Sequence, residues 1–301
     1  MEARIGEFAA LFTALCWTVT AISFESASRK VGSVPVNIIR LVMALVLLSL
    51  FSWARRGYFF PSDASAFNWF WLALSGLVGF VIGDLFLFKA FTVIGSRLSL
   101  LIMTLVPPIA AFVGWMLMGE TLAPVHMAGM LLTLSGIALV IFHKHRERKK
   151  QLTPLEQIPI QGVVFALLGA AGQATGLVLS KFGMQEYDAF SATQIRVMAG
   201  IAGFAIVIHF FRKWLAVNRA FRHRRALLLM LLGATFGPFL GVSASLIAVQ
   251  NTATGIASTI MSISPILILP ATFLIYRHTI SWKEFLGAVI SVGGVALFFI
   301  F

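Results

Sequence analysis

Ten long apolar runs constrain the fold of this chain more than any other feature of its sequence. Each is about 20 residues long, the length that a helix needs to cross about 30 Å of hydrocarbon. Lipid offers the backbone no hydrogen-bond partners, so we expect helices. The alternating pattern of a membrane β-barrel is absent. The sequence predicts an all-α integral membrane protein with ten transmembrane helices, at about 5–24, 34–53, 67–88, 93–118, 124–142, 158–180, 190–211, 226–248, 254–276 and 281–301.

The amino-acid composition excludes several other classes of protein. Hydrophobic residues make up 59% and charged residues 11% of the chain, whereas a soluble domain carries roughly 25% charged residues. The single Cys16 excludes an internal disulfide and a cysteine metal cluster. Walker A, His-Glu-x-x-His and Gly-x-Ser-x-Gly motifs are absent, and the six histidines lack metal-ligand spacing. We therefore expect no catalytic residues, no metal and no cofactor.

The chain repeats itself. Arg40 matches Arg196 at an offset of 156, and Pro107 matches Pro265 at an offset of 158. The repeat predicts a first five-helix half at 1–142, a basic linker loop at 143–157 and a second five-helix half at 158–301. Five is an odd number of spans, so the second half enters the membrane upside down. Two inverted five-helix repeats are a transporter architecture and a physical basis for alternating access.

The order of several short motifs, present in two copies, resembles the EamA-type domains of the drug/metabolite transporter superfamily. The second copy runs from Ala248 through Gly294, and it departs from the first where Gly119-Glu120 is replaced by Arg277-His278. The resemblance implies a ten-helix carrier of metabolites or drugs, often an exporter in a bacterial inner membrane. It also implies that Gly119 and Glu120 have a structural role in the turn into span five. The motifs of the first copy are Ala90-Phe91, Gly95-Ser96, Leu98–Leu101, Pro107, Gly119-Glu120-Thr121-Leu122, Gly129 and Ser135–Leu139.

Ionisable side chains inside a span are costly in lipid, so each marks a candidate site. Asp84 and Lys89 are five residues apart, which puts them about 140° apart on a helix and makes them poor partners. Asp84 is expected to pair with Arg40, Arg97 or a substrate amine, as a structural ion pair or as a proton or substrate site. Lys89 either snorkels to the interface or takes part in binding. The repeat mates Arg40 and Arg196 either snorkel to lipid headgroups or clamp neighbouring helices. Alternatively, one of them holds an anionic carboxylate.

Four other residues are binding candidates because of their polarity. Trp17 and its repeat mate Gln173 fall in the middle of spans one and six, and Trp115 falls in span four. An indole N–H at membrane depth needs an acceptor, which either a cavity wall or interior packing provides. Asn251 belongs to a polar cluster between spans eight and nine, either a loop or the rim of a cavity.

Prolines and glycines predict interrupted helices at corresponding positions of the two halves. A proline removes a backbone donor and frees a carbonyl. Interrupted helices of this kind either mark a transporter site or are packing kinks. The candidates for helix breaks or gating are Gly83, Pro107, Pro108, Gly241, Pro265 and Pro270.

These features favour a secondary active transporter that exports small metabolites such as amino acids, driven by the proton gradient or by exchange. The alternatives are an intramembrane enzyme acting on lipid-linked substrates and a non-transporting scaffold subunit. A monomer and a homodimer are both compatible with the sequence.

The formal charge of +12 is concentrated in two basic loops, 143–150 and 211–225. Short basic loops beside a bilayer serve the positive-inside rule and bind anionic lipid headgroups, so we expect no nucleic-acid partner. Loop charge predicts that these loops are cytoplasmic and that both termini lie outside. Several characterised relatives in the superfamily that this chain resembles keep both termini inside the cell, which favours the opposite orientation.

Overall fold

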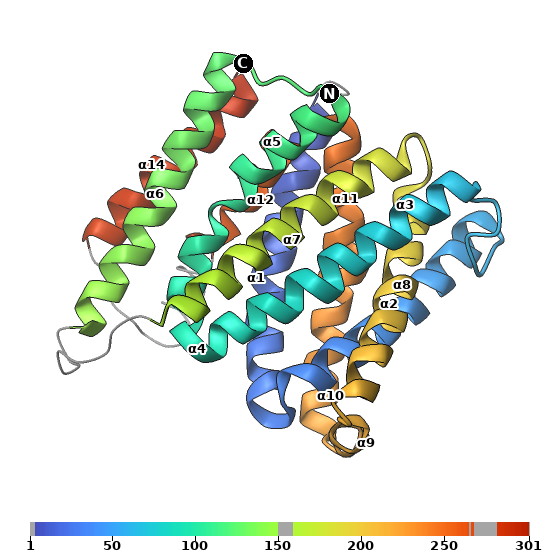
Figure 1. Cartoon of the computed structure of the whole chain (residues 1–301). Coiled ribbons are helices and arrows are strands. Elements are labelled where there is room, and N and C mark those ends of the chain that lie inside the picture. Colours follow the sequence, from blue (N-terminus) through green and yellow to red (C-terminus); the bar gives the residue numbers. More distant parts are fainter. Residues whose placement is uncertain (1–3, 150–158, 265, 268–281, 301) are drawn as a thin grey trace.

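The computed structural model describes residues 4–149, 159–264, 266–267 and 282–300, and all regular structure within these residues is helical (Figure 1). The first half contains α1 (Ile5–Val31), α2 (Ser33–Arg56), α3 (Ala66–Gly76), the π-helix η2 (Leu77–Gly83), α4 (Asp84–Met103), α5 (Val106–Met118) and α6 (Pro124–Lys149). The second half contains α7 (Ile160–Met184), α8 (Ala189–Phe210), α9 (Trp214–Ala220), α10 (Arg224–Ala234), the π-helix η3 (Thr235–Gly241), α11 (Val242–Asn251), α12 (Thr254–Met261) and α14 (Trp282–Ile300).

The helices have the length and apolarity that a bilayer requires. Among the described residues, six segments are long and apolar enough to cross a membrane, and Val106–Met118, Pro124–Leu139 and Phe285–Ile300 are shorter apolar helices. Many large apolar side chains, including Phe70, Phe112 and Leu131, are exposed on the outside of the bundle, as expected where lipid replaces water. The chain is a multi-pass integral membrane protein, and the all-α prediction is confirmed.

Equivalent helices of the two halves cross the bundle in opposite directions, and the two halves share unusual local features. Both ends of the chain lie at one face, where α1 begins, whereas α7 begins toward the other face (Figure 1). The π-helices Leu77–Gly83 and Thr235–Gly241 are separated by the predicted offset of 158. Such π-segments are rare and often lie at functional sites. The backbone therefore repeats where the sequence repeats.

The helix interruptions also occur at equivalent positions. α4 ends at Met103 and α12 ends at Met261, each followed by a two-residue turn, Thr104–Leu105 or Ser262–Ile263. The amide of Leu105 donates to Ile102 at 3.0 Å, and that of Ile263 donates to Ile260 at 3.2 Å. Pro107 and Pro108 follow the first turn and lie in the first turn of α5, where no N–H is needed.

The prediction that the chain turns between residues 88 and 93 is wrong. Helix α3, η2 and α4 run without interruption from Ala66 to Met103. The segment from Lys89 to Thr92 contains neither glycine nor proline, so nothing in it stops the helix. The second half differs here, because α11 ends at Asn251 and Thr252 is extended before α12 begins at Thr254.

Glycines bring α7 of the second half close to the long helix of the first half. A Cβ on Gly176 would lie 2.7 Å from the Cα of Gly79, and a Cβ on Gly172 would lie 2.9 Å from the Cα of Gly83. Small residues allow this backbone approach in membrane helices. The two halves thus pack directly against each other around the centre of the bundle.

Candidate functional site

A cavity of about 290 Å³ lies between the two halves. Its wall combines one arginine and one glutamine with serine hydroxyls and a larger apolar surface. A mostly apolar cavity with a few convergent polar groups is typical of small-molecule sites. The lining residues are Trp17, Ala21, Phe80, Met103, Thr104, Val106, Gln173, Leu177, Arg196, Val242, Ser245, Ser258, Met261, Ser262 and Ser264.

The two equivalent helix breaks form part of this wall. Met103 and Thr104 line the cavity from the first half, and their repeat mates Met261 and Ser262 line it from the second. Helix interruptions that face a central cavity occur in transporters whose sites lie at the repeat interface. Each half therefore contributes a helix break to the cavity wall, at turns that precede the predicted positions 107 and 265 in the sequence.

Trp17 and Gln173 occupy equivalent places in the cavity wall. Trp17 packs over Gly241, since a Cβ on that glycine would lie 3.1 Å from the indole Cδ1 and Nε1. Gln173 packs over Gly83, where a Cβ would lie 3.2 Å from the backbone nitrogen of Gln173. Each side chain thus lies over the glycine that ends the π-helix of the opposite half.

A buried polar cluster adjoins the cavity. Arg40 forms an ion pair with Asp84, and the amide Nε2 of Gln173 donates to Oδ1 of Asp84 at 2.6 Å. The guanidinium of Arg40 also lies 5.1 Å from the centroid of the Phe24 ring. Gln173 belongs both to this cluster and to the cavity wall. The polar cluster therefore connects α2, α4 and α7 beside the cavity.

Arg196 differs from its repeat mate Arg40. It lines the cavity and is 5% exposed. Its guanidinium lies 5.0 Å from the centroid of the Phe80 ring. Among the residues that the structure describes, the Nε of Arg196, like that of Arg40, has no hydrogen-bond acceptor. Asp84 interacts with Arg196 electrostatically but forms its ion pair with Arg40.

Three predicted binding residues lie away from the cavity. Trp115 is 57% exposed and its ring contacts Phe112 on the outside of α5. Lys89 is exposed on α4, with its Nζ 4.9 Å from the centroid of the Phe165 ring. Asn251 is exposed, and its amide donates to the Ile247 carbonyl one turn earlier in α11. Pro265 and Pro270 lie outside the described residues.

Glu120 connects the halves at another point. Its Oε2 accepts hydrogen bonds from the amide and hydroxyl of Thr254, at 2.8 and 2.6 Å, and so caps the N-terminus of α12. Its Oε1 lies 2.6 Å from Nζ of Lys181 in α7. Gly119 ends α5 in the left-handed conformation, with a φ of 67°. Glu120 therefore has contacts across the repeat interface, in addition to its place in the turn.

Sequence reasoning missed the serines of the cavity and Phe80. Ser245 and Ser258 are common residues in membrane helices, and nothing in their spacing distinguishes them. A signal existed for Thr104 and Ser262, since both hydroxyl residues precede the matched proline positions by three residues.

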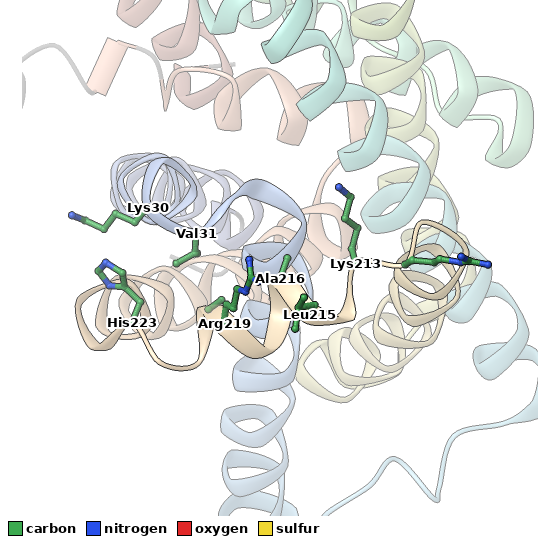
Figure 2. A pocket seen from close by; sticks show the side chains of 9 residues that line it. Lys30, Val31, Lys213, Leu215, Ala216, Arg219 and His223 are labelled. Carbon is green, nitrogen blue, oxygen red and sulfur yellow. The ribbon is translucent and has the colours of Figure 1, made fainter.

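A second cleft, of about 480 Å³, lies between the end of α1 and the basic segment 211–225. Figure 2 shows Lys30 of α1 and Arg219 and His223 of the α9 region along its edge. Lys213 and Arg212 complete its basic lining, and all five side chains are exposed. This cleft is therefore a surface feature, separate from the central cavity.

Comparison with known proteins agrees with this architecture. No curated protein matches the sequence. Twenty-nine chains of solved structures match, and one of them, a crystal structure of a protein, has a TM-score of 0.73. It covers 97% of this chain and 95% of its own at 17% identity, a likeness of fold. A model of the EamA-like transporter family matches residues 4–142 and again residues 160–300. The chain belongs to the EamA-like transporter family, with one EamA domain in each half.

Proposed function

We propose that this transporter carries a small amphiphilic metabolite, such as an amino acid, through the central cavity by alternating access. EamA proteins are a family of transporters and not of enzymes. The observation that supports the proposal is the cavity between two inverted halves, with a helix break from each half in its wall. Transporters with this arrangement work by alternating access around a site at the repeat interface, and this likeness supports the proposed mechanism.

The size of the cavity limits the substrate. Ligand pockets for drug-sized molecules range from about 300 to 1,000 Å³, and this cavity, of about 290 Å³, lies at the lower end. Its apolar wall includes Phe80, Leu177 and Met261. A molecule of amino-acid size with an apolar part fits these dimensions better than a large multi-ring drug.

The central experiment is transport by the purified protein in liposomes. Labelled amino acids, nucleosides and aromatic amines are supplied outside, with and without a pH gradient and with and without unlabelled substrate inside. Flux of an unmodified solute supports the proposal and excludes a scaffold role. Absence of flux for every solute under every gradient contradicts it.

The same system identifies the energy source. A proton-coupled carrier needs a titratable group within the bundle, and Asp84 is a buried carboxylate beside the cavity. Asp84→Asn is expected to abolish accumulation driven by a pH gradient while exchange is retained. Full gradient-driven uptake by this variant would remove Asp84 from the coupling mechanism.

We also propose that the basic face of the protein is cytoplasmic and contacts anionic lipid headgroups. The cleft of Lys30, Arg219 and His223 lies on this face, and lysine and arginine are enriched in cytoplasmic loops. Arg222→Cys and Glu186→Cys, each on a Cys16→Ser background, place a thiol at opposite faces. In intact cells an impermeant thiol reagent is expected to label position 186 but not position 222, and the reverse pattern contradicts this orientation.

A further inference from the structure

From the geometry of the basic cleft, we infer that it is a binding site for one phospholipid with an anionic phosphate headgroup. The cleft lies between the end of α1 and the segment 211–225. The inference rests on the proposed contact of the basic face with lipid, and it specifies which residues bind the phosphate and which bind the rest of the molecule. It does not depend on the substrate of the central cavity.

Uncompensated positive charge is the first argument. Five of the nine residues that line the cleft are basic, and none is acidic. Among the described residues, none of these five side chains forms an ion pair. Arg55, Arg56 and Lys181, by contrast, each pair with a carboxylate elsewhere in the bundle. Like charges gathered in one cleft repel one another, so an anion that enters the cleft relieves this repulsion.

His223 adds a donor of fixed position. Its Nδ1 accepts a hydrogen bond of 3.3 Å from the amide of Ala226 and caps the N-terminus of α10. A neutral imidazole whose Nδ1 accepts carries its proton on Nε2. Figure 2 shows this imidazole at the same end of the cleft as Lys30, with Arg219 farther along the edge. Guanidinium, ammonium and imidazole donors, which bind phosphate oxygens, therefore lie along one cleft.

The apolar part of the lining is the second argument, and it favours a lipid over a free phosphate. Val31, Leu215 and Ala216 line the cleft beside the basic residues. A lipid presents both a phosphate and an apolar part to such a lining, whereas a free phosphate presents only the first. Aromatic side chains gather where hydrocarbon meets headgroups, and this part of the chain has four exposed ones: Phe210, Phe211, Trp214 and Phe221.

Helix α9 has the orientation of an interfacial helix. Figure 1 shows it nearly end-on at the end of the bundle, whereas α8 and α10 are seen along their length, so α9 lies across them. Val217 and Ala220 of α9 are buried against the bundle, while Leu215 and Arg219 are exposed. An amphipathic helix of this kind lies at the level of the headgroups. The cleft beside α9 is therefore at the depth of a lipid phosphate.

The experiment measures lipid binding to the purified protein in detergent by native mass spectrometry. The probes are dioleoyl phosphatidylglycerol, which is anionic, and dioleoyl phosphatidylcholine, which has the same acyl chains and no net charge. We expect one phosphatidylglycerol to bind at concentrations about tenfold or more below those that phosphatidylcholine needs, because each nearby lysine or arginine contributes about fivefold in affinity. Equal binding of the two lipids would overturn both the inference and the proposed lipid contact.

Charge-matched variants locate the site. Lys213→Gln with Arg219→Gln removes two charges from the cleft, and Arg222→Gln with Arg225→Gln removes two charges of the same segment outside its lining. All four side chains are exposed, so both variants are expected to fold. At about fivefold for each side chain near the headgroup, we expect the cleft variant to lose about twentyfold in affinity for phosphatidylglycerol and the control less than about twofold. Equal losses would overturn the inference and leave a general contact between the basic face and lipid in place.

Free phosphates form the last arm of the experiment. Inorganic phosphate and glycerol phosphate are added to the complex with phosphatidylglycerol, and we expect the lipid to stay bound at millimolar concentrations of either. Displacement of the lipid at these concentrations would overturn its assignment as the ligand. None of these measurements involves transport, so the flux experiments in liposomes test the proposed transport separately.

Discussion

Gln173 of α7 donates a hydrogen bond of 2.6 Å to Asp84 of α4, so a side chain of the second half holds a charged group of the first half. Gln173→Leu leaves one carboxylate oxygen without its donor. Loss of a hydrogen bond to a buried charged group costs about 1.5–3 kcal/mol. We expect a lower melting temperature and reduced transport, measured in detergent and in liposomes. Gln161→Leu, at an exposed position of the same helix, is the control, and equal melting temperatures for both variants would contradict this prediction.

The contact between Gly176 and Gly79 sets the distance between the halves. A Cβ on Gly176 would meet backbone atoms at 2.7 Å, and backbone cannot move aside as a flexible side chain can. Gly176→Ala is expected to destabilise the protein by about 1–3 kcal/mol through overpacking. Gly293→Ala in α14 meets nothing within 4 Å and is expected to be neutral or stabilising. Thermal unfolding of both variants checks the prediction, which fails if Gly176→Ala is as stable as Gly293→Ala.

The ion pair between Glu120 and Lys181 connects the α5–α6 turn to α7. Glu120→Gln retains an acceptor for Thr254 but loses the charge opposite Lys181. Since the two side chains are partly buried, we expect a coupling energy of about 0.5–3 kcal/mol in a double-mutant cycle with Lys181→Met. Glu186→Gln, which removes an exposed carboxylate, is the reference variant. A coupling energy of zero between Glu120 and Lys181 would show that the pair contributes nothing to stability.

Asp63 lies in the loop before α3 and connects to Tyr187, which lies between α7 and α8. Partial burial acts to raise the pKa of Asp63, but hydrogen bonds from Tyr187 and Arg56 outweigh it and lower the pKa below its ordinary value. A lowered folded-state pKa stabilises the protein above the ordinary carboxyl range and loses this effect as the pH falls below about 4.

Asp63→Asn is therefore expected to flatten the decline in stability on the acid side of pH 4 and to change little at pH 7 beyond the lost ion pair. Melting temperatures measured from pH 3 to pH 7, with Glu186→Gln for comparison, test this expectation. If the melting temperature of Asp63→Asn falls below pH 4 as steeply as that of the wild type, other carboxyl groups cause the fall and the prediction is wrong.

Part of the site was predictable because charge and proline are distinctive in a membrane helix. Asp84, Arg196 and Gln173 attract attention as polar groups within spans, and the structure brings all three to the cavity or its edge. Pro107 indicated an interruption, but a proline is tolerated in the first turn of a helix, so the turn precedes it at Thr104–Leu105.

Other features were beyond sequence reasoning. The α5 helix is apolar on all sides, so its periodicity does not separate the face toward lipid, which contains Trp115 and Met116, from the face toward the protein. The turn expected near residue 90 was wrong because apolar length alone set the boundary. The bond between Gln173 and Asp84 depends on how two halves pack, which no local pattern encodes.

The break at Thr252 in the second half has no counterpart in the first, where α4 continues as a helix through the equivalent residues near position 94. Two segments of related sequence therefore hold two different shapes in one molecule. A state with the shapes exchanged, bent near residue 94 and straight through residue 252, would use only conformations that this chain already adopts. For the proposed alternating access, the asymmetry between the two halves thus predicts the shape of the second state.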